Sequence, residues 1–118
     1  MKITDSTFRI RKVSKPWGRE EWIALSDKYA GKLLLIKKNR RLSLQFHKKK
    51  HETLYLLSGK VRLILQNRII IMHQGQSRVI TPGTVHRIEA LETDVCIIEV
   101  STPELTDVVR LEDDFSRT

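Results

Sequence analysis

The sequence lacks several features that would place it outside a reducing compartment or in a membrane. Cys96 is the single cysteine of the 118 residues, so no disulfide can form within one chain. No apolar run approaches the roughly 18 residues that a membrane-spanning helix needs. Met1–Ile10 is mixed and polar, without the apolar segment of a secretory signal peptide. We therefore expect a cytoplasmic protein without a membrane partner.

Aromatic residues are also scarce, at 6% of the chain. Nucleic-acid interfaces use exposed aromatics among basic residues, or a recognition helix, and the sequence shows neither. It also lacks a glycine-rich phosphate loop and a nucleophile elbow. The formal net charge is nevertheless +8, which favours an anionic partner. We expect a phosphorylated small molecule rather than a nucleic acid.

Short β-like segments separated by turn residues dominate the chain, and its length suits one domain over residues 1–118. Many short strands without long helices predict an all-β protein, closed into a small barrel or jelly roll. Asp5–Arg11 and Asp113–Thr118 are each predicted as a short helix or a frayed end. The predicted strands are Trp17–Ala24, Tyr29–Lys37, Ser43–His47, Thr53–Leu57, Lys60–Leu65, Arg68–His73, Ser77–Ile80, Val85–Ala90, Val95–Ser101 and Asp107–Leu111.

Four polar residues form a candidate metal site. Gln45 and His47 are two residues apart, so on one strand their side chains leave the same face. Glu52 begins the next predicted strand, and His86 follows a Pro-Gly turn. Imidazole, carboxylate and amide donors together suit a divalent Zn, Mn, Fe, Co or Ni ion. The alternative interpretation is that these histidines are structural or exposed, as lone histidines in strands usually are.

These residues carry a family resemblance. Gln45-x-His47-x4-Glu52-x6-Gly59 resembles the first cupin motif, with Gln in place of its first His. Gly75 with Pro82-Gly83-x-x-His86 resembles the second cupin motif, with one extra residue before the proline. The resemblance implies a small cupin-type double-stranded β-helix, or jelly-roll barrel, with its motif core at about 41–90. It also aligns Gln45, His47, Glu52 and His86 with the metal ligands.

A closer resemblance is to the cupin domain of type II mannose-6-phosphate isomerases. It rests on Arg41-x-Ser43-x-Gln45-x-His47, on Lys15-Pro16-Trp17-Gly18, on His86-Arg87 and on the tail Val109–Asp113. In bifunctional members this domain follows a nucleotidyltransferase domain, which this sequence does not contain. The resemblance implies sugar-phosphate isomerisation and, because cupin barrels often pair through their sheets, a homodimer.

The basic residues suggest where a substrate phosphate could bind. Arg41 and Arg87 are candidates because a guanidinium can hold a phosphate through two hydrogen bonds. Lys49 is a third candidate, since it lies between His47 and Glu52 and thus near the predicted barrel mouth. The alternative is that such charge runs are solvated surface.

Two functions remain open at this stage. The first is a metal-dependent aldose/ketose isomerase acting on a sugar phosphate, whose catalytic base no residue identifies. The second is a non-catalytic cupin that binds a metal and a sugar as a sensor or partner subunit. Iron-dependent oxygen chemistry is a third possibility, but the Gln45 variant and the basic residues argue against it.

Overall fold

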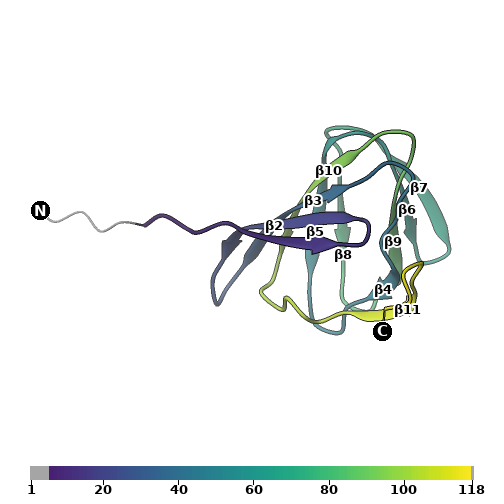
Figure 1. The fold of residues 1–118 in the computed structure, drawn as a ribbon. Coiled ribbons are helices and arrows are strands. Elements are labelled where there is room, and N and C mark those ends of the chain that lie inside the picture. Colours follow the sequence, from purple (N-terminus) through teal and green to yellow (C-terminus); the bar gives the residue numbers. More distant parts are fainter. Residues whose placement is uncertain (1–5, 118) are drawn as a thin grey trace, which may run out of the picture.

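The computed structural model describes residues 6–117, which contain eleven β-strands and no helix, and therefore no helix able to span a membrane (Figure 1). In chain order the strands are β1 (Arg11–Lys15), β2 (Gly18–Leu25), β3 (Ala30–Ile36), β4 (Leu44–Phe46), β5 (Glu52–Ser58), β6 (Val61–Leu65), β7 (Arg68–Met72), β8 (Ser77–Ile80), β9 (His86–Ala90), β10 (Val95–Ser101) and β11 (Val109–Glu112).

The strands form two antiparallel sheets that enclose a barrel (Figure 1). One sheet has the order β1-β2-β3-β10-β5-β8, and the other has the order β11-β4-β9-β6-β7. Apolar side chains from both sheets pack together in the barrel interior, among them Leu54, Leu56, Leu63, Met72 and Ile97. This arrangement confirms the predicted all-β jelly roll.

Each chain end was predicted as a short helix or a frayed end, and the helix alternative is wrong. Residues 6–10 have no regular structure and Arg11 begins β1. Asp113–Thr118 is also not helical over its described part. Asp5 and Thr118 themselves lie outside the described residues. The sequence of β1 is polar with one valine, so its hydrophobic pattern is weak, and antiparallel pairing with β2 makes it a strand.

The alternation of β5 directs Glu52, a candidate metal ligand, into the barrel. Glu52, Leu54 and Leu56 are buried, whereas Tyr55 and Leu57 are exposed. Glu52 therefore shares its face with core leucines, as expected for a half-buried strand. A carboxylate in that position needs polar or charged partners inside the barrel.

Strand β9 is buried at all five positions, because both of its faces are covered. His86, Ile88 and Ala90 alternate with Arg87 and Glu89 along the strand, so the two groups lie on opposite faces. The Arg87 and Glu89 side chains form ion pairs on the outer side of the sheet.

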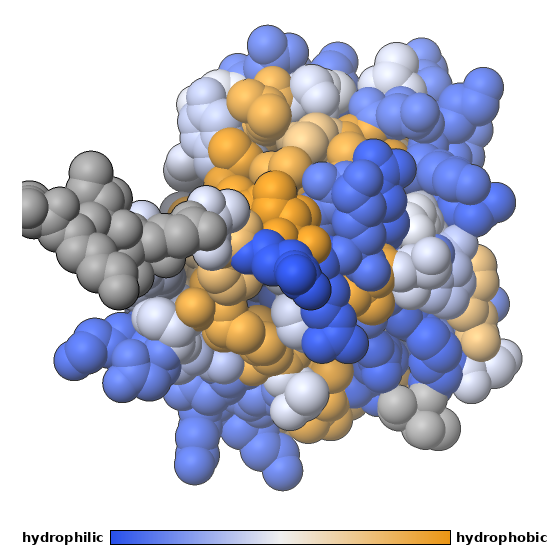
Figure 2. Space-filling model, turned by 60° about the vertical axis from the view of Figure 1, so that its left-hand side comes forward, coloured by the Kyte–Doolittle hydropathy of each residue, from blue (hydrophilic) through white to orange (hydrophobic). Residues whose placement is uncertain are grey.

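The outer side of the six-stranded sheet exposes apolar residues. Tyr55, Leu57, Val79 and Val100 lie on its neighbouring strands β5, β8 and β10, and Val100 is 57% exposed. The side of the molecule turned forward in Figure 2 carries a group of apolar residues bordered by hydrophilic ones. Contiguous exposed apolar surface often marks an interaction site.

Candidate metal centre

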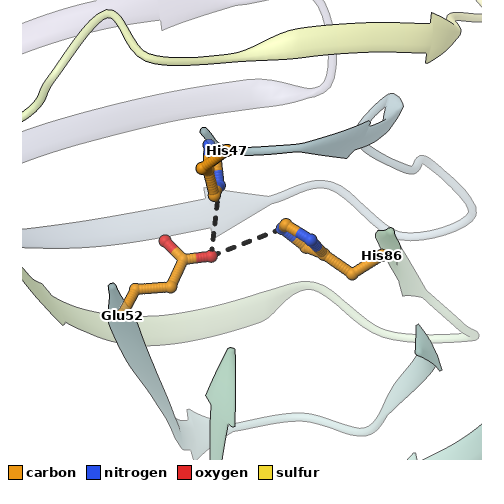
Figure 3. Close-up of side chains that lie close together, drawn as sticks. All are labelled: His47, Glu52 and His86. Atoms are coloured by element: carbon orange, nitrogen blue, oxygen red, sulfur yellow. Dashed lines mark ion pairs between the residues drawn. The ribbon is translucent and has the colours of Figure 1, made fainter. Parts of the chain in front are cut away.

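His47, Glu52 and His86 converge inside the barrel (Figure 3). Their ligand atoms lie within 4.8 Å of one another, and all three side chains are buried. His47 follows β4, Glu52 begins β5 and His86 begins β9. The structure thus brings together three of the four residues that the sequence predicted as metal ligands, from both sheets.

Backbone contacts fix the orientation of both imidazole rings. Nδ1 of His47 lies 2.6 Å from the carbonyl oxygen of Asp107, and Nδ1 of His86 lies 2.9 Å from that of Thr84. A carbonyl oxygen only accepts hydrogen bonds, so each Nδ1 must carry the hydrogen. In the neutral rings the lone pair is then on Nε2, which is the usual arrangement of a metal-binding histidine.

Both Nε2 atoms face the same oxygen of Glu52. The distances to Glu52 Oε1 are 3.4 Å from His47 and 3.3 Å from His86. Two lone pairs and a carboxylate oxygen repel one another unless positive charge lies between them, either as protons or as a metal cation. The donor set of two imidazoles and one carboxylate therefore fits a divalent transition-metal ion.

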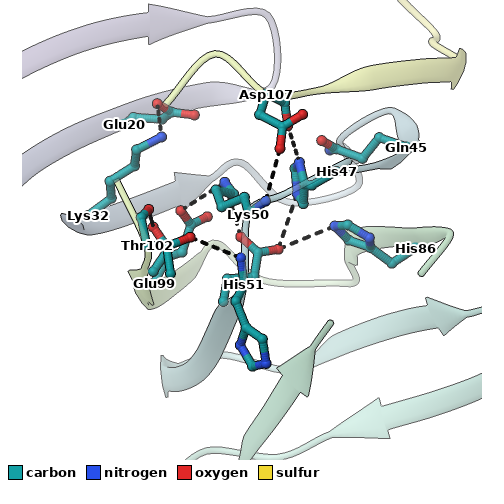
Figure 4. A network of polar contacts seen from close by, with 12 residues as sticks. Glu20, Lys32, Gln45, His47, Lys50, His51, His86, Glu99, Thr102 and Asp107 are labelled. Atoms are coloured by element: carbon teal, nitrogen blue, oxygen red, sulfur yellow. Dashed lines mark hydrogen bonds and ion pairs between the residues drawn. The ribbon is translucent and has the colours of Figure 1, made fainter. Parts of the chain in front are cut away.

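Gln45 lies beside this group. It is on β4, directly opposite His86 in the pairing of β4 with β9. Figure 4 shows its carboxamide next to the His47 ring, and its Nε2 lies 3.5 Å from the carbonyl oxygen of Ser43. Gln45 thus lies on the same cavity wall as the triad.

A buried charge network joins Glu52 to Lys50 and Glu99, and Figure 4 labels the last two. Lys50 Nζ lies 3.1 Å from Glu52 Oε2 and 3.3 Å from Glu99 Oε2. The contact with Glu52 is an ion pair without hydrogen-bond geometry. Burial acts to raise the pKa of Glu52, but the facing His47 and His86 imidazoles and the Lys50 charge hold that pKa well below its ordinary value. For Glu99, burial and the neighbouring Glu52 raise the pKa.

A second ion pair lies further along the cavity. Lys32 Nζ is 3.4 Å from Glu20 Oε1, and Trp22 Nε1 donates a hydrogen bond of 2.9 Å to the same oxygen. The Lys32 ammonium also lies 5.3 Å from the centre of the Trp22 ring, within the range of a cation–π contact. The sequence analysis did not identify this pair. Lys32 alternates along β3 with Leu34 and Ile36, and all three are buried on the same face of the strand.

These residues line one cavity of about 360 Å³. Its wall carries the triad, Gln45, both buried ion pairs and Trp22. Three further basic residues, Lys15, Arg110 and Arg117, also line it. The space is large enough for a small polar ligand.

The three residues predicted to bind phosphate lie elsewhere. Among the described residues that line this cavity, Arg41, Lys49 and Arg87 do not occur. Arg41 binds Asp114 and Glu89, at 2.7 Å and 3.1 Å. Arg87 follows His86 on β9, so its side chain lies on the opposite face, where it donates to the Leu42 carbonyl oxygen. Lys49 is exposed. Their phosphate role stays a prediction that no contact with the cavity supports.

Comparison with known families gives one match that spans nearly the whole chain. The family described as "Mannose-6-phosphate isomerase C-terminal" matches residues 4–113. Among curated proteins, xanthan biosynthesis protein XanB of Xanthomonas campestris pv. campestris is 30% identical over 112 residues, covering 92% of this chain and 24% of XanB. Mannose-1-phosphate guanylyltransferase ManC of Salmonella typhimurium is 30% identical, covering 91% of this chain and 23% of ManC. This chain therefore spans about a quarter of these relatives.

Solved structures show the same fold at low sequence identity. An RmlC-like cupin from Shewanella frigidimarina superposes with a TM-score of 0.76 at 14% identity, covering 84% of this chain and 88% of that one. KdgF from Halomonas sp. gives a TM-score of 0.75 at 18% identity, covering 85% and 90%. Oxalate decarboxylase from Bacillus subtilis gives a TM-score of 0.77 at 18% identity, and the match covers 86% of this chain and 30% of that one. These matches confirm the cupin fold.

Proposed function

Because the chain belongs to the mannose-6-phosphate isomerase C-terminal family, we propose that it is a metal-dependent isomerase interconverting an aldose phosphate and a ketose phosphate. The observation that carries this proposal is the orientation of His47 and His86, which both direct Nε2 at Glu52 Oε1 inside a cavity. A family match without such a site would support the fold alone.

In this proposal His47, Glu52 and His86 hold a divalent Zn, Mn, Fe, Co or Ni ion, and Gln45 supplies a fourth donor. When bound, such an ion polarises a carbonyl group and stabilises negative charge that develops on its oxygen. The interior of the cavity favours an added cation. Its buried ion-pair network has the carboxylates of Glu20, Glu52 and Glu99 but only the ammonium groups of Lys32 and Lys50.

A divalent ion would leave this network with a net positive charge, which favours an anionic substrate. Lys15, Arg110 and Arg117 add positive charge on the cavity wall. We assign attraction of the substrate phosphate to these three residues, in place of Arg41, Lys49 and Arg87. Trp22 lines the same wall, where Arg11 and Lys32 lie 4.8 Å and 5.3 Å from its ring centre, and the indole can contact the carbon skeleton of a sugar.

A non-catalytic role is the second candidate, in which the same cavity binds a metal and a sugar phosphate for sensing or as a partner subunit. One observation favours it. Glu20, a cavity carboxylate outside the triad, is held in an ion pair with Lys32. Burial acts to raise the pKa of Glu20, but the Lys32 charge and the Trp22 hydrogen bond outweigh burial and lower that pKa. A carboxylate that is paired in this way is a poorer proton acceptor for aldose–ketose interconversion.

The two functions are separated by following mannose 6-phosphate with the metal-loaded protein in heavy water by proton NMR. We expect fructose 6-phosphate to form, with deuterium entering from solvent, and chelation to stop both processes. A ligand that binds, seen by line broadening, without conversion or deuterium incorporation would establish the binding role. A protein that neither binds a divalent ion nor perturbs the sugar spectrum would overturn both.

We also propose that the protein is a homodimer formed through the outer side of the six-stranded sheet. The exposed apolar side chains of Tyr55, Leu57, Val79 and Val100 support this assignment. Light scattering coupled to size exclusion measures the mass directly. Val100→Lys should shift a dimer towards monomer, and a monomeric parent protein would contradict the proposal.

A further inference from the structure

Asp107 lies in the segment that joins β10 to β11 and makes two kinds of contact with the turn that follows β4. Its carboxylate accepts backbone hydrogen bonds from Lys48 at 3.1 Å, Lys49 at 2.7 Å and Lys50 at 2.9 Å. Its backbone carbonyl oxygen is the atom that Nδ1 of His47 contacts at 2.6 Å. One residue thus binds both the backbone of this turn and the imidazole at its start.

These contacts lead to Glu52 by two routes. Through His47, Asp107 fixes the ring whose Nε2 faces Glu52 Oε1 at 3.4 Å. Through the backbone of Lys50, it fixes the residue whose ammonium lies 3.1 Å from Glu52 Oε2. Asp107 thus contacts the two residues, His47 and Lys50, that face the two carboxylate oxygens of Glu52.

We propose that Asp107 is a positioning residue for the metal centre, holding His47 and Lys50 in the geometry that Glu52 requires. This inference rests on the proposed metal site and adds to it a residue that does not bind the ion. Groups that orient metal ligands commonly change affinity when they are removed, by about 10–100-fold. The carboxylate is the part of Asp107 that mutagenesis can test, because the carbonyl belongs to the backbone.

The chain offers a matched control for an aspartate that only caps a turn. Asp94 is exposed and its Oδ1 accepts a backbone hydrogen bond from Lys38 at 2.9 Å. Neither aspartate belongs to the triad; Asp107 lines the cavity, whereas Asp94 does not. Asp107→Asn and Asp94→Asn therefore make the same chemical change at two turns, and only the first turn carries a metal ligand.

The experiment measures Co²⁺ affinity and the visible spectrum of the bound ion by titration of each full-length variant. Asp107→Asn should weaken binding about 10–100-fold and change the ligand-field bands, whereas Asp94→Asn should leave both as in the parent protein. Amide exchange of Lys48, Lys49 and Lys50 reports whether the cap has been lost. Parent-like affinity and bands in Asp107→Asn, with these amides exchanging faster, would overturn the proposal.

A second readout needs no metal. In the metal-free protein, the ¹⁵N shift of His47 Nδ1 should move towards that of an unbonded ring in Asp107→Asn and stay unchanged in Asp94→Asn. If the parent protein binds no Co²⁺, the proposed metal centre fails. The His47 shift then still decides whether Asp107 positions this ring, and an unmoved shift refutes that role.

Discussion

Gln45 and His86 lie directly opposite each other in the antiparallel pairing of β4 and β9. His86 belongs to the triad, whereas Gln45 stands where the first cupin motif has a histidine. The pairing places the Gln45 side chain on the cavity wall with the triad. In the proposed metal site the amide would be the fourth donor, with less affinity for late transition metals than an imidazole.

Replacing Gln45 tests this fourth donor. Gln45→His should tighten Ni²⁺ and Zn²⁺ binding, because imidazole is the stronger donor to these ions. Gln45→Ala should weaken binding less than loss of a triad residue does. Calorimetric titration measures both affinities. Two variants with the affinity of the parent protein would remove Gln45 from the ligand set.

Loss of a triad histidine should remove the metal and the activity together. His47→Ala and His86→Ala each leave two protein ligands of the triad, and elemental analysis after gel filtration measures the retained ion. His73→Ala is the control, because His73 is exposed and lies outside the triad. Stoichiometric metal in both triad variants would contradict the assignment.

The acid dependence of stability should change in Glu52→Gln. The pKa of Glu52 is lowered well below 4.5 in the folded protein, so its ionisation stabilises the fold above about pH 4.5. That contribution is lost as the pH falls through the lowered pKa. Thermal unfolding of the metal-free variant should therefore depend less on pH below about 4.5 than that of the parent protein.

Glu99→Gln should act in the opposite sense. The pKa of Glu99 is raised above 4.5 by burial and by Glu52, so the folded protein holds this proton more tightly than the unfolded chain. Its contribution to stability is present below pH 4.5 and is lost as the pH rises through the raised pKa. Stability of the variant should not decline over this pH range. Parallel curves of unfolding temperature against pH for the variant and the parent protein would contradict the expectation.

The phosphate assignment predicts a difference between two lysines of β1. Lys15 lines the cavity, whereas Lys12, on the same strand, does not. Lys15→Met should raise KM for mannose 6-phosphate several-fold, and the effect should shrink at high salt because the attraction is electrostatic. Lys12→Met should leave KM unchanged. Steady-state kinetics at two ionic strengths measure both, and equal KM values would exclude the assignment.

Gly59 should tolerate no side chain. Its φ is +93°, and a Cβ atom would lie 2.7 Å from the Asp94 carbonyl oxygen. Gly75 has a similar φ of +89° but open space around it. Gly59→Ala should therefore destabilise the protein by more than Gly75→Ala, whose cost is the positive φ alone, about 1 kcal/mol. Denaturant unfolding of both variants gives the comparison.

Alternation predicted most of the strands, because it depends on local sequence, and the resemblance to the two cupin motifs aligned His47, Glu52 and His86 with one metal site. Strand β1 was missed, since its pairing rather than its polar sequence makes it a strand. Asp107 was missed because its partners lie 57 to 60 residues away. The orientation of Arg87 could have been predicted, because it follows His86 on one strand and adjacent residues of a strand point to opposite faces.

The two imidazoles of the site are supported over very different lengths of chain. His86 contacts a carbonyl oxygen two residues before it, so its orientation is established as soon as its own turn forms. His47 depends on a carbonyl oxygen 60 residues further along the chain. If β11 and the segment before it detached, His86 would keep its orientation and His47 would lose the contact that orients its ring. The geometry of the candidate site is coupled to the docking of the segment around Asp107, and retention of the proposed metal ion would report whether that segment has folded into place.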